Sequence, residues 1–415
     1  MKKRVMIFCD FYLPSYKSGG GMWTIVNLVD RFCHKYDFFI VTRNYDSKGD
    51  KKPYTNVKTD EWNQTGNAKV FYFSPKNLTR GFFTKLIDEV NPEAFFLNSV
   101  FATPVIKFLM ARRSRKLEHI PLIIAPCGEF TPAGLAIKPF KKRIFLQYAK
   151  SVNLYRNVIW KASNEAEKDE IKEVIGENEE IWIAPDLTPK TILPEFKPEW
   201  KPFKEEGSVK FVFLSRLVRK KNIHFFLERL SEIKSGKIEF SVIGPPEDSD
   251  YVRECRSIAE KLPKNISVIF TGAYPYGEAL KKICEKHFFV LPTLNENFGY
   301  VCIEALAAGC PLLLSDGTMW SDVQDKSAGW SISLENLSAW NELIKKCVEM
   351  NETEYKRMSA AAREYSLEWL ADPKFVEETA KIFDRAFGEK ASEKASEKAK
   401  ETAKEKANKV KNFAG

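Results

Sequence analysis

The fold is decided by the stretch PTLNENFGYVCIEALAAGCP, residues 292–311. The apolar run 288–291 directly before it predicts a buried strand, and a helix is expected to begin near Phe298. The Gly-Cys-Pro sequence ends that helix, and the apolar run 311–314 predicts the next strand. A strand, a crossover helix and a second strand form the unit of a parallel sheet, so this stretch predicts an α/β protein.

The same alternation runs through most of the chain. In the first half, buried strands are expected at 5–9, 38–42, 69–73, 94–97, 122–125 and 158–160. Helical patterns lie between and after them, at 22–35, 79–90, 101–116, 139–154 and 165–176. In the second half the alternation restarts, with strands expected at 209–214, 238–243, 266–270, 288–291 and 311–314. The sequence therefore predicts two doubly wound, Rossmann-like sheets in series.

A proline-rich segment separates the two halves. Five prolines lie between residues 185 and 202, and such a segment sustains neither a helix nor a central strand. We expect an N-terminal domain, a linker, a C-terminal domain, a helix that returns to the N-terminal domain and a charged tail, at 1–190, 191–206, 207–371, 372–388 and 389–415. The tail has strong helix formers but no apolar stripe, which favours a solvated helix or a disordered appendage over a partner-binding arm.

Composition limits the class of protein. The chain has 415 residues and a net charge of +9, of which the segment 389–411 carries +3. The remaining charge is mild for this length, so it favours anionic partners and argues against a nucleic-acid-binding protein. The eight cysteines form no CxxC pair and the four histidines show no metal-ligand spacing, which predicts small core cysteines in a reducing compartment. No apolar run fits a secretory signal or a membrane span, so we expect a cytoplasmic protein.

The first of three constellations with chemical potential is a glycine cluster. Gly19, Gly20 and Gly21 lie between the first expected strand and an amphipathic helix. Glycines at a helix start allow a tight turn and let a phosphate approach backbone N–H groups. The cluster is not the GxGxxG of dinucleotide-binding proteins, and by itself it also fits a flexible turn between strand and helix.

The second constellation is LSRLVRKKN, residues 214–222, which follows the first strand of the second half. Arg216 and Lys221 fall at the C-terminal edge of the expected sheet, where open α/β folds bind ligands. A guanidinium provides a bidentate fork and an ammonium a mobile point charge, and the two together suit adjacent phosphates. A solvated basic loop is the alternative interpretation.

The third constellation lies in the fold-deciding stretch itself. Glu296 precedes the expected helix and Glu304 lies about two turns along it, while the helix N-terminus offers free N–H groups to a phosphate. Each carboxylate can accept two hydrogen bonds from a diol. A nucleotide sugar supplies all three groups: a sugar diol, a pyrophosphate and a ribose diol. The alternative, an unrelated loop acid and helix acid, is less favoured because a strand precedes the pair and a Gly-Cys-Pro stop follows it.

In this order, the three motifs resemble those of the family 4 glycosyltransferases, over roughly residues 4–388. The resemblance implies the GT-B architecture, in which two Rossmann-like domains face each other across a cleft, with the acceptor on the N-terminal side and the donor on the C-terminal side. It also implies site roles. The donor sugar would contact Glu296, the ribose would be held by Glu304, and the sugar and phosphates would lie against the backbone of Asn297, Phe298 and Gly299.

The resemblance implies further that Arg216 and Lys221 neutralise the leaving pyrophosphate beside the loop of Gly20 and Gly21. It implies retention of anomeric configuration, no metal and no cofactor, with a UDP-sugar as the expected co-substrate. A fixed Arg/Lys clamp and a helix terminus can stabilise a developing diphosphate charge without a cation. The Asp-x-Asp sequence at 248–250 is spelled like the metal site of other glycosyltransferases, but it follows Gly-Pro-Pro in an expected loop, so a metal site there is the minor alternative.

One segment departs from the family pattern. Members often carry histidine or another basic residue before the glycine of the loop after the fifth strand, whereas this chain has Pro126-Cys127-Gly128-Glu129. That contact to donor or acceptor therefore lacks its usual residue. Glu129 is a candidate acid of the acceptor site, and a structural loop acid is the alternative.

The acceptor side shows one further pattern. The segment 139–150 places Phe140, Ile144, Phe145 and Tyr148 on one helical face, beside a basic run. Such a helix fits contact with an anionic membrane, helped by the basic cluster 112–116 if both lie on the same side. The alternative is an ordinary surface helix whose apolar face lies in the core.

The sequence thus predicts an enzyme, a glycosyltransferase that moves a sugar from a nucleotide sugar to a hydroxyl of a glycan or lipid-linked glycan. With membrane contact, it would be peripheral at the inner membrane face. One alternative is a GT-B sugar-phosphate synthase, which needs a phosphate-binding acceptor pocket. The other is a non-catalytic nucleotide- or sugar-binding subunit, against which the intact set Arg216, Lys221, Glu296 and Glu304 argues. The sequence specifies no oligomeric state.

Overall fold

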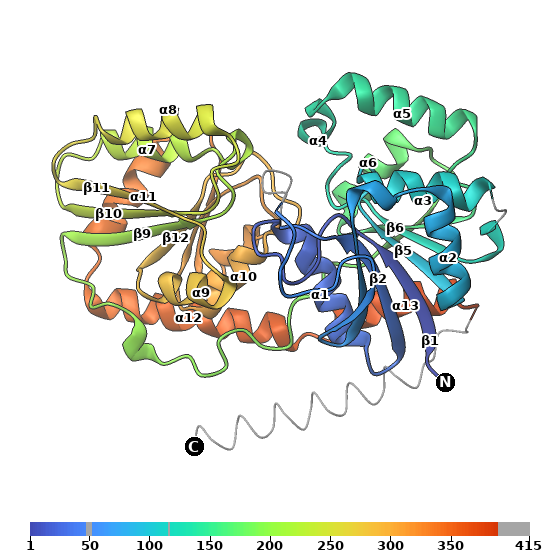
Figure 1. Cartoon of the computed structure of the whole chain (residues 1–415). Helices are drawn as coiled ribbons and strands as arrows, with labels where there is room; N and C mark the ends of the chain where they lie inside the picture. The colour runs from blue at the N-terminus through green and yellow to red at the C-terminus, as the bar shows by residue number, and fades with distance from the viewer. Residues whose placement is uncertain (47–51, 115–116, 389–415) are drawn as a thin grey trace, which may run out of the picture.

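The computed structural model describes residues 1–46, 52–114 and 117–388. Within these ranges the chain forms two α/β domains side by side, each with a largely parallel sheet between layers of helices (Figure 1). The predicted fold class, the GT-B architecture with two Rossmann-like domains, is confirmed. The expected tail at 389–415 lies outside the described residues.

The N-terminal domain contains an eight-stranded sheet in the order β3-β4-β2-β1-β5-β6-β7-β8. Its strands are β1 (Lys3–Phe8), β2 (Tyr36–Arg43), β3 (Trp62–Thr65), β4 (Ala68–Phe73), β5 (Ala94–Asn98), β6 (Leu122–Ala125), β7 (Val158–Ala162) and β8 (Glu180–Ile183). All pairs are parallel except β3 with β4. Strands β3 and β8 were not predicted, because each lies at a sheet edge and lacks the continuous buried run of the central strands.

The helices of this domain follow the predicted alternation. They are α1 (Gly20–Phe32), α2 (Arg80–Val90), α3 (Thr103–Ser114), α4 (Pro132–Ala136), α5 (Pro139–Ser151) and α6 (Glu165–Val174). The short helix α4 was not predicted. Thr131 caps its N-terminus by accepting a hydrogen bond from the Gly134 amide, with Pro132 at the first helical position.

The C-terminal domain contains a six-stranded parallel sheet in the order β11-β10-β9-β12-β13-β14. Its strands are β9 (Ser208–Leu214), β10 (Lys237–Ile243), β11 (Ile266–Gly272), β12 (Phe288–Leu291), β13 (Leu312–Ser315) and β14 (Gly329–Ile332), the last of which was not predicted. The helices are α7 (Ile223–Ser231), α8 (Ser249–Ala259), α9 (Tyr276–Cys284), α10 (Tyr300–Ala307), α11 (Leu337–Glu349), α12 (Glu352–Ala371) and α13 (Lys374–Ala386).

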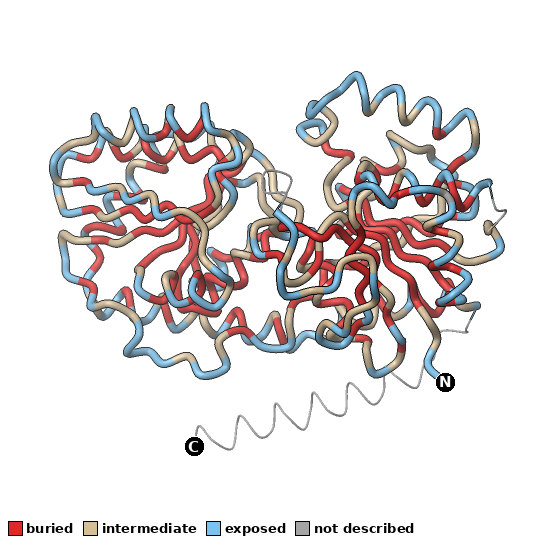
Figure 2. The backbone as a smooth tube through the Cα atoms, in the orientation of Figure 1, coloured by how far each residue is buried: buried red, intermediate tan, exposed pale blue. Residues whose placement is uncertain are grey.

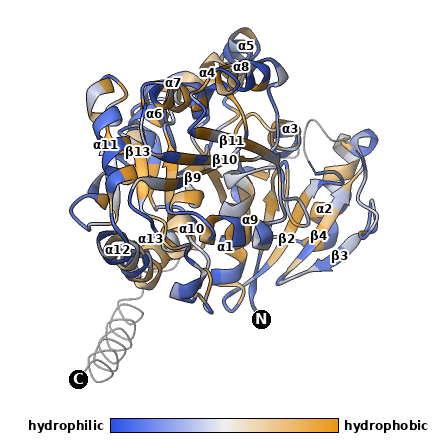
Figure 3. Ribbon diagram, turned by 90° about the vertical axis from the view of Figure 1, so that its left-hand side faces the viewer, coloured by the Kyte–Doolittle hydropathy of each residue, from blue (hydrophilic) through white to orange (hydrophobic). Residues whose placement is uncertain are grey.

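Each sheet is buried on both faces, which explains why its strands read as continuous apolar runs (Figure 2). In β1, Met6 and Phe8 pack into one core of the N-terminal domain, whereas Val5 and Ile7 pack into the core on the opposite face. Hydrophobic residues accordingly concentrate on strands such as β2 and β13 (Figure 3). All eight cysteines are free thiols, and six of them are buried.

The last helix packs against the N-terminal domain rather than against its neighbours in sequence. In Figure 1, α12 runs along the C-terminal domain and α13 lies beneath the sheet of the N-terminal domain. The ring of Phe383 lies 4.8 Å from that of Tyr36, and Arg385 forms a two-pronged ion pair with Glu180. The proline-rich linker is held to α12, because Arg363 donates hydrogen bonds to the carbonyls of Ile192 and Leu193.

The order of the strands determines where a ligand can enter. In each sheet the strand order reverses beside the first strand of the domain, so that β1 lies between β2 and β5, and β9 lies between β10 and β12. Loops leave the C-terminal ends of the strands in opposite directions at such a point and open a crevice. The crevices of the two domains face each other.

Candidate functional site

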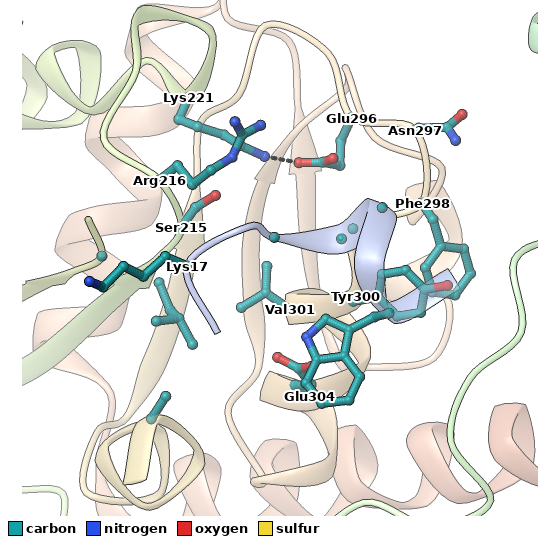
Figure 4. A pocket seen from close by; sticks show the side chains of 18 of the residues that line it. Lys17, Ser215, Arg216, Lys221, Glu296, Asn297, Phe298, Tyr300, Val301 and Glu304 are labelled. Carbon is teal, nitrogen blue, oxygen red and sulfur yellow. Dashed lines mark hydrogen bonds and ion pairs between the residues drawn. The ribbon is translucent and has the colours of Figure 1, made fainter. Parts of the chain in front are cut away.

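A cavity of about 300 Å³ lies between the two domains, at the C-terminal edges of both sheets. It brings together every donor-side residue singled out from the sequence: Gly19, Gly20, Gly21, Arg216, Lys221, Glu296, Asn297, Phe298, Gly299 and Glu304. Figure 4 shows Arg216 and Lys221 on one side of the cavity, with a dashed line from Lys221 to Glu296, and the side chains of Phe298 and Tyr300 on the other side. The lining also includes residues that the sequence analysis did not single out, chiefly Lys17, Trp23, Asp186, Lys220 and Tyr276.

The cationic wall is formed by the loop after β9. A single 3₁₀ turn, Arg219–Lys221, ends at Asn222 in the left-handed region, and this turn points Lys221 back toward the sheet. Lys221 is buried and forms an ion pair with Glu296, while Arg216 is half-exposed and pairs with Glu247 at 3.0 Å. Arg216 thus keeps an accessible guanidinium edge at the mouth of the cavity.

Glu296 is positioned by the loop between β12 and α10. Its amide donates to the carbonyl of Gly317, and the neighbouring loop is tied to the cationic turn because Leu294 donates to the carbonyl of Lys220. Burial by itself raises the pKa of the Glu296 carboxyl, but the ammonium of Lys221, with Lys220 and Arg216 further away, outweighs burial and lowers that pKa. The carboxylate is therefore ionised at neutral pH and available as a hydrogen-bond acceptor.

Helix α10 directs its N-terminus at the same cavity. Gly299 caps the helix with a φ of +77°, and a Cβ there would lie 3.1 Å from Cγ of Glu296, so only glycine fits without strain. The carbonyl of Phe298 accepts a hydrogen bond from the indole of Trp320 at 2.7 Å, which fixes the turn before the helix. A fixed helix N-terminus with its partial positive charge is suited to a phosphate.

Glu304 lies about one turn into α10, which begins at Tyr300, and it lines the cavity. Burial raises the pKa of its carboxyl to about 7, and the hydroxyl of Tyr276 opposes this shift only in part. Tyr276 also packs against Trp23 of the N-terminal domain, with ring centroids 4.5 Å apart. Glu304 thus occupies an apolar recess closed by aromatic rings from both domains.

The glycine loop of the N-terminal domain meets the C-terminal domain at close range. A Cβ at Gly19 would lie 3.4 Å from Nε of Arg216, and a Cβ at Gly20 would lie 3.4 Å from the ring of Tyr300. The hydroxyl of Tyr300 reaches across the cleft to donate to Thr24 at 3.3 Å and to the Leu187 carbonyl at 3.2 Å. A Cβ at either position would therefore be in van der Waals contact with the other domain, and the φ of +80° at Gly19 favours glycine there.

The loop that departs from the family pattern has two roles. Gly128, with a φ of +73°, lies against Asn297, whose side chain donates to Ser163 at 3.4 Å. The carboxylate of Glu129 instead accepts hydrogen bonds from the amides of Val100 and Phe101 and from the Ser99 hydroxyl, at the start of α3. Glu129 is not among the residues that line the cavity, and its carboxylate ties the loop after β6 to the segment that leads into α3; its role as an acceptor-site acid stays a prediction.

Beneath this loop lies a buried polar cluster that the sequence analysis missed. Lys161 forms a 2.8 Å ion pair with Asp186, and both side chains are only 4% exposed. Glu167 accepts hydrogen bonds from the amides of Gly128 and Ser163. Lys161 directly follows the expected strand 158–160 and belongs to β7 in the structure. A lysine at the end of a buried strand was the one signal in the sequence that could have indicated the cluster.

The Asp-x-Asp sequence has a local explanation. Asp248 caps α8 by accepting a hydrogen bond from the Tyr251 amide at 3.0 Å, and Asp250 pairs with Arg253 on the same helix. In the ranges that the structure describes, no three His, Cys, Asp or Glu side chains are grouped so as to hold a metal ion.

In the comparison with known proteins, residues 196–365 match the family model of glycosyl transferases group 1. An uncharacterized 41.2 kDa protein in the cps region of Klebsiella pneumoniae is 21% identical over 281 residues, 64% of this chain and 75% of that protein. The alpha-monoglucosyldiacylglycerol synthase of Streptococcus pneumoniae is 28% identical over 111 residues, 26% of this chain and 24% of that protein.

Solved structures share the fold over nearly the whole chain. Sucrose-phosphate synthase from Thermosynechococcus elongatus has a TM-score of 0.68 at 13% identity, covering 93% of this chain and 100% of that one. HepE of Anabaena, in complex with UDP and glucose, has a TM-score of 0.61 at 12% identity, covering 92% of this chain and 99% of that one.

Proposed function

We propose that this chain, a transferase with a group 1 glycosyltransferase domain, moves a sugar from a nucleotide-sugar donor to a hydroxyl of a glycan or lipid-linked glycan, with retention of configuration. The observation that carries the proposal is the single cavity in which Arg216 and Lys221, the N-terminus of α10, and the two acids Glu296 and Glu304 converge. This set provides a site for a diphosphate between two sites for hydroxyl groups.

The donor is held in three parts. The diphosphate lies between the cationic turn and the N-terminus of α10, where the charges of Arg216 and Lys221 meet backbone N–H groups. Glu304 accepts hydrogen bonds from the ribose diol in its aromatic recess. Glu296, ionised because of Lys221, accepts hydrogen bonds from the transferred sugar. UDP is the proposed carrier, supported by the fold likeness to HepE, which was solved with UDP and glucose.

The residues present account for the reaction without a carboxylate nucleophile. The bond between the anomeric carbon and the diphosphate oxygen breaks, the acceptor oxygen bonds to that carbon on the same face, and the acceptor proton passes to the departing phosphate oxygen. Arg216 and Lys221 stabilise the negative charge that develops on the leaving diphosphate. Such electrostatic stabilisation is generally the largest single contribution that an enzyme makes to lowering the activation barrier. Cys127 is no substitute base, because burial raises the pKa of its thiol well above the usual value.

The acceptor is proposed as a glycan or a lipid-linked glycan. The relative from Klebsiella pneumoniae is named for the cps region, and the relative from Streptococcus pneumoniae is named for a glucosylated diacylglycerol. Both names support polysaccharide or glycolipid assembly as the process in which this chain works.

A sugar-phosphate synthase is the second candidate, and one observation favours it. Lys17 lines the cavity from the N-terminal domain and so places a cation on the acceptor side. Its ammonium lies 3.7 Å from the carboxylate of Asp46. The fold likeness to sucrose-phosphate synthase is consistent with that function. Comparing hexose phosphates with unphosphorylated glycans as acceptors decides between the two, because only a synthase requires the phosphate.

The proposal is tested by nucleotide release from UDP-, GDP- and ADP-sugars in the presence of EDTA. We expect release from one donor, a loss of about 10²–10³-fold in Arg216→Ala, and an unchanged rate in the matched control Arg253→Ala, whose side chain pairs within α8. Equal rates in wild type and Arg216→Ala would contradict the assigned clamp. If no donor is cleaved and none raises the melting temperature, the chain is a non-catalytic protein of this fold.

A further inference from the structure

One helix of the N-terminal domain turns an apolar face to solvent. We define the α5 face as Ile137, Phe140, Ile144 and Tyr148, which are 62%, 74%, 49% and 46% exposed. Phe140, Ile144 and Tyr148 recur at helical spacing and form one stripe along α5, and Ile137, at the end of α4, lies in the chain just before it. In Figure 2, α5 is exposed along most of its length, on the side of the domain away from α13.

The helix is anchored through its opposite side, so the stripe is not needed for packing. Phe145, expected on the same face from the sequence, instead turns inward and packs against Phe101 at 6.0 Å. Ala149 is fully buried. The core of the domain is thus complete without the α5 face. The alternative prediction, an ordinary surface helix whose apolar face lies in the core, is wrong for Phe140, Ile144 and Tyr148, because these side chains are exposed.

Charge around the stripe has one sign. The segment 130–164 contains no aspartate or glutamate and seven lysines and arginines, of which Lys161 is buried in its ion pair with Asp186. On a helical projection, Lys141 borders the stripe on one side, while Arg143 and Lys150 border it on the other, and all three are exposed. An apolar stripe with cations on both borders is complementary to a surface with an anionic layer over a hydrocarbon layer.

Helix α5 is connected to the cavity through a short series of contacts. Lys142 donates to the carbonyl of Gly134 in α4 at 2.8 Å, and its ammonium lies 4.3 Å from the centre of the Phe101 ring. Gly134 in turn packs on the loop after β6, since a Cβ there would lie 2.9 Å from the carbonyl oxygen of Gly128. Gly128 lines the cavity, so α5 is connected to the cavity wall through α4 and the loop after β6.

From these observations we infer that the α5 face binds the surface of an anionic phospholipid bilayer and brings the acceptor side of the cavity to it. If the chain has the proposed function, this membrane contact means that its acceptor is lipid-linked, and this part of the inference rests on the proposed function. It does not need a spanning segment, and in the described part of the chain no helix is long and apolar enough to cross a membrane.

One member of the basic cluster expected to assist does not reach the surface. Arg112 is buried and donates to the carbonyl of Arg156, so it cannot meet lipid headgroups. Arg113 is exposed, while the next two basic residues of the cluster, 115 and 116, lie outside the described residues. The electrostatic part of the binding is therefore assigned to the cations that border the α5 face.

The test is flotation of the full chain with vesicles, in the absence of any donor. We expect binding to vesicles of about 70% phosphatidylcholine and about 30% phosphatidylglycerol, and at least tenfold weaker binding to phosphatidylcholine alone. Replacing Phe140, Ile144 and Tyr148 by serine should weaken binding to the anionic vesicles at least tenfold. The matched control replaces Phe203, Ile269 and Leu367, equally exposed apolar residues elsewhere, and should bind as wild type does.

A second pair of variants separates charge from apolar contact. Lys141, Arg143 and Lys150 replaced by serine should bind at least tenfold more weakly at low salt, whereas serine at Lys261, Lys264 and Lys345 should have no effect. Equal binding by the α5 variants and their controls would overturn the inference. So would a dimer in sedimentation velocity that only the apolar α5 variant disrupts, because the face would then join two copies of the chain.

The membrane inference and the proposed function can be contradicted independently of each other. Binding without turnover of any donor would overturn the proposed function and leave the α5 face in place. Turnover of a soluble glycan acceptor without binding to either vesicle would retain the transferase and overturn the membrane inference.

Discussion

The ammonium of Lys221 forms an ion pair with the carboxylate of Glu296, although the two residues are 75 positions apart. They meet because β9 and β12 are neighbours in the sheet, so that the loops after both strands leave from the same edge. Lys221 is 8% exposed and Glu296 is 17% exposed. The pair therefore joins the proposed phosphate site to the proposed sugar site.

Replacing Lys221 by methionine tests this pair. We expect nucleotide release to fall by about 10²–10³-fold, because a fixed donor to the leaving group is lost. Without the ammonium, the pKa of Glu296 should rise, so the acidic limb of the residual activity should move to higher pH. A pH–rate profile of Lys221→Met beside the exposed control Lys234→Met measures both effects, and an unmoved acidic limb would show that the pair does not set that pKa.

Glu304 makes the stability of the chain depend on pH. Its pKa of about 7 lies above the usual 4.5, so the folded protein holds a proton that the unfolded chain releases, and stability falls between pH 4.5 and 7. Glu304→Gln removes this cost, which is on the order of 3 kcal/mol. We expect a higher melting temperature than wild type at pH 8 and no difference at pH 4.5. A variant no more stable than wild type at pH 8 would contradict the raised pKa.

The same carboxyl should control donor binding. Only the ionised form of Glu304 accepts two hydrogen bonds from a ribose diol, so the affinity for a nucleotide should increase as pH rises through about 7. Calorimetric titration with the nucleotide identified from the donor panel measures this trend. The trend should disappear in Glu304→Gln, whose affinity we expect to be low at every pH.

Gly128→Ala should impair activity through the approach of the two domains. A Cβ would meet Asn297 at 3.4 Å, and the φ of +73° adds about 1–2 kcal/mol of backbone strain. Gly66→Ala is the control, because Gly66 has a similar φ of +57° but open space around it. Both variants should lose similar stability in urea, whereas only Gly128→Ala should lose turnover. Equal turnover in the two would show that the Asn297 contact has no role in the reaction.

Glu129→Ala separates a structural acid from an acceptor-site acid. We expect a loss of about 1–3 kcal/mol in the free energy of unfolding, because the amides of Val100 and Phe101 lose their acceptor. The KM for the acceptor should stay as in wild type. A raised KM without a loss of stability would restore the sequence-based interpretation of Glu129.

The sequence identified most of the proposed donor site because its motifs are short and local. A glycine cap, a basic turn and an acid before a helix each follow directly after a buried strand, and parallel strands bring all such loops to one edge. The residues that it missed, such as Trp23 and Tyr276, reach the cavity from helices of different domains. Nothing in local periodicity distinguishes those rings from ordinary core aromatics.

The sequence by itself thus determined the two sheets and the residues at their edges, because apolar periodicity and the backbone limits of glycine and proline act over a few residues. Tertiary structure alone decided which charges pair and which faces are covered. Glu129 binds the amides of Val100 and Phe101 because the fold places the segment before α3 beside it. Phe145 turned inward while Phe140 stayed exposed because only one side of α5 meets the core. An apolar stripe is a local property, but its burial depends on what the rest of the chain places against it.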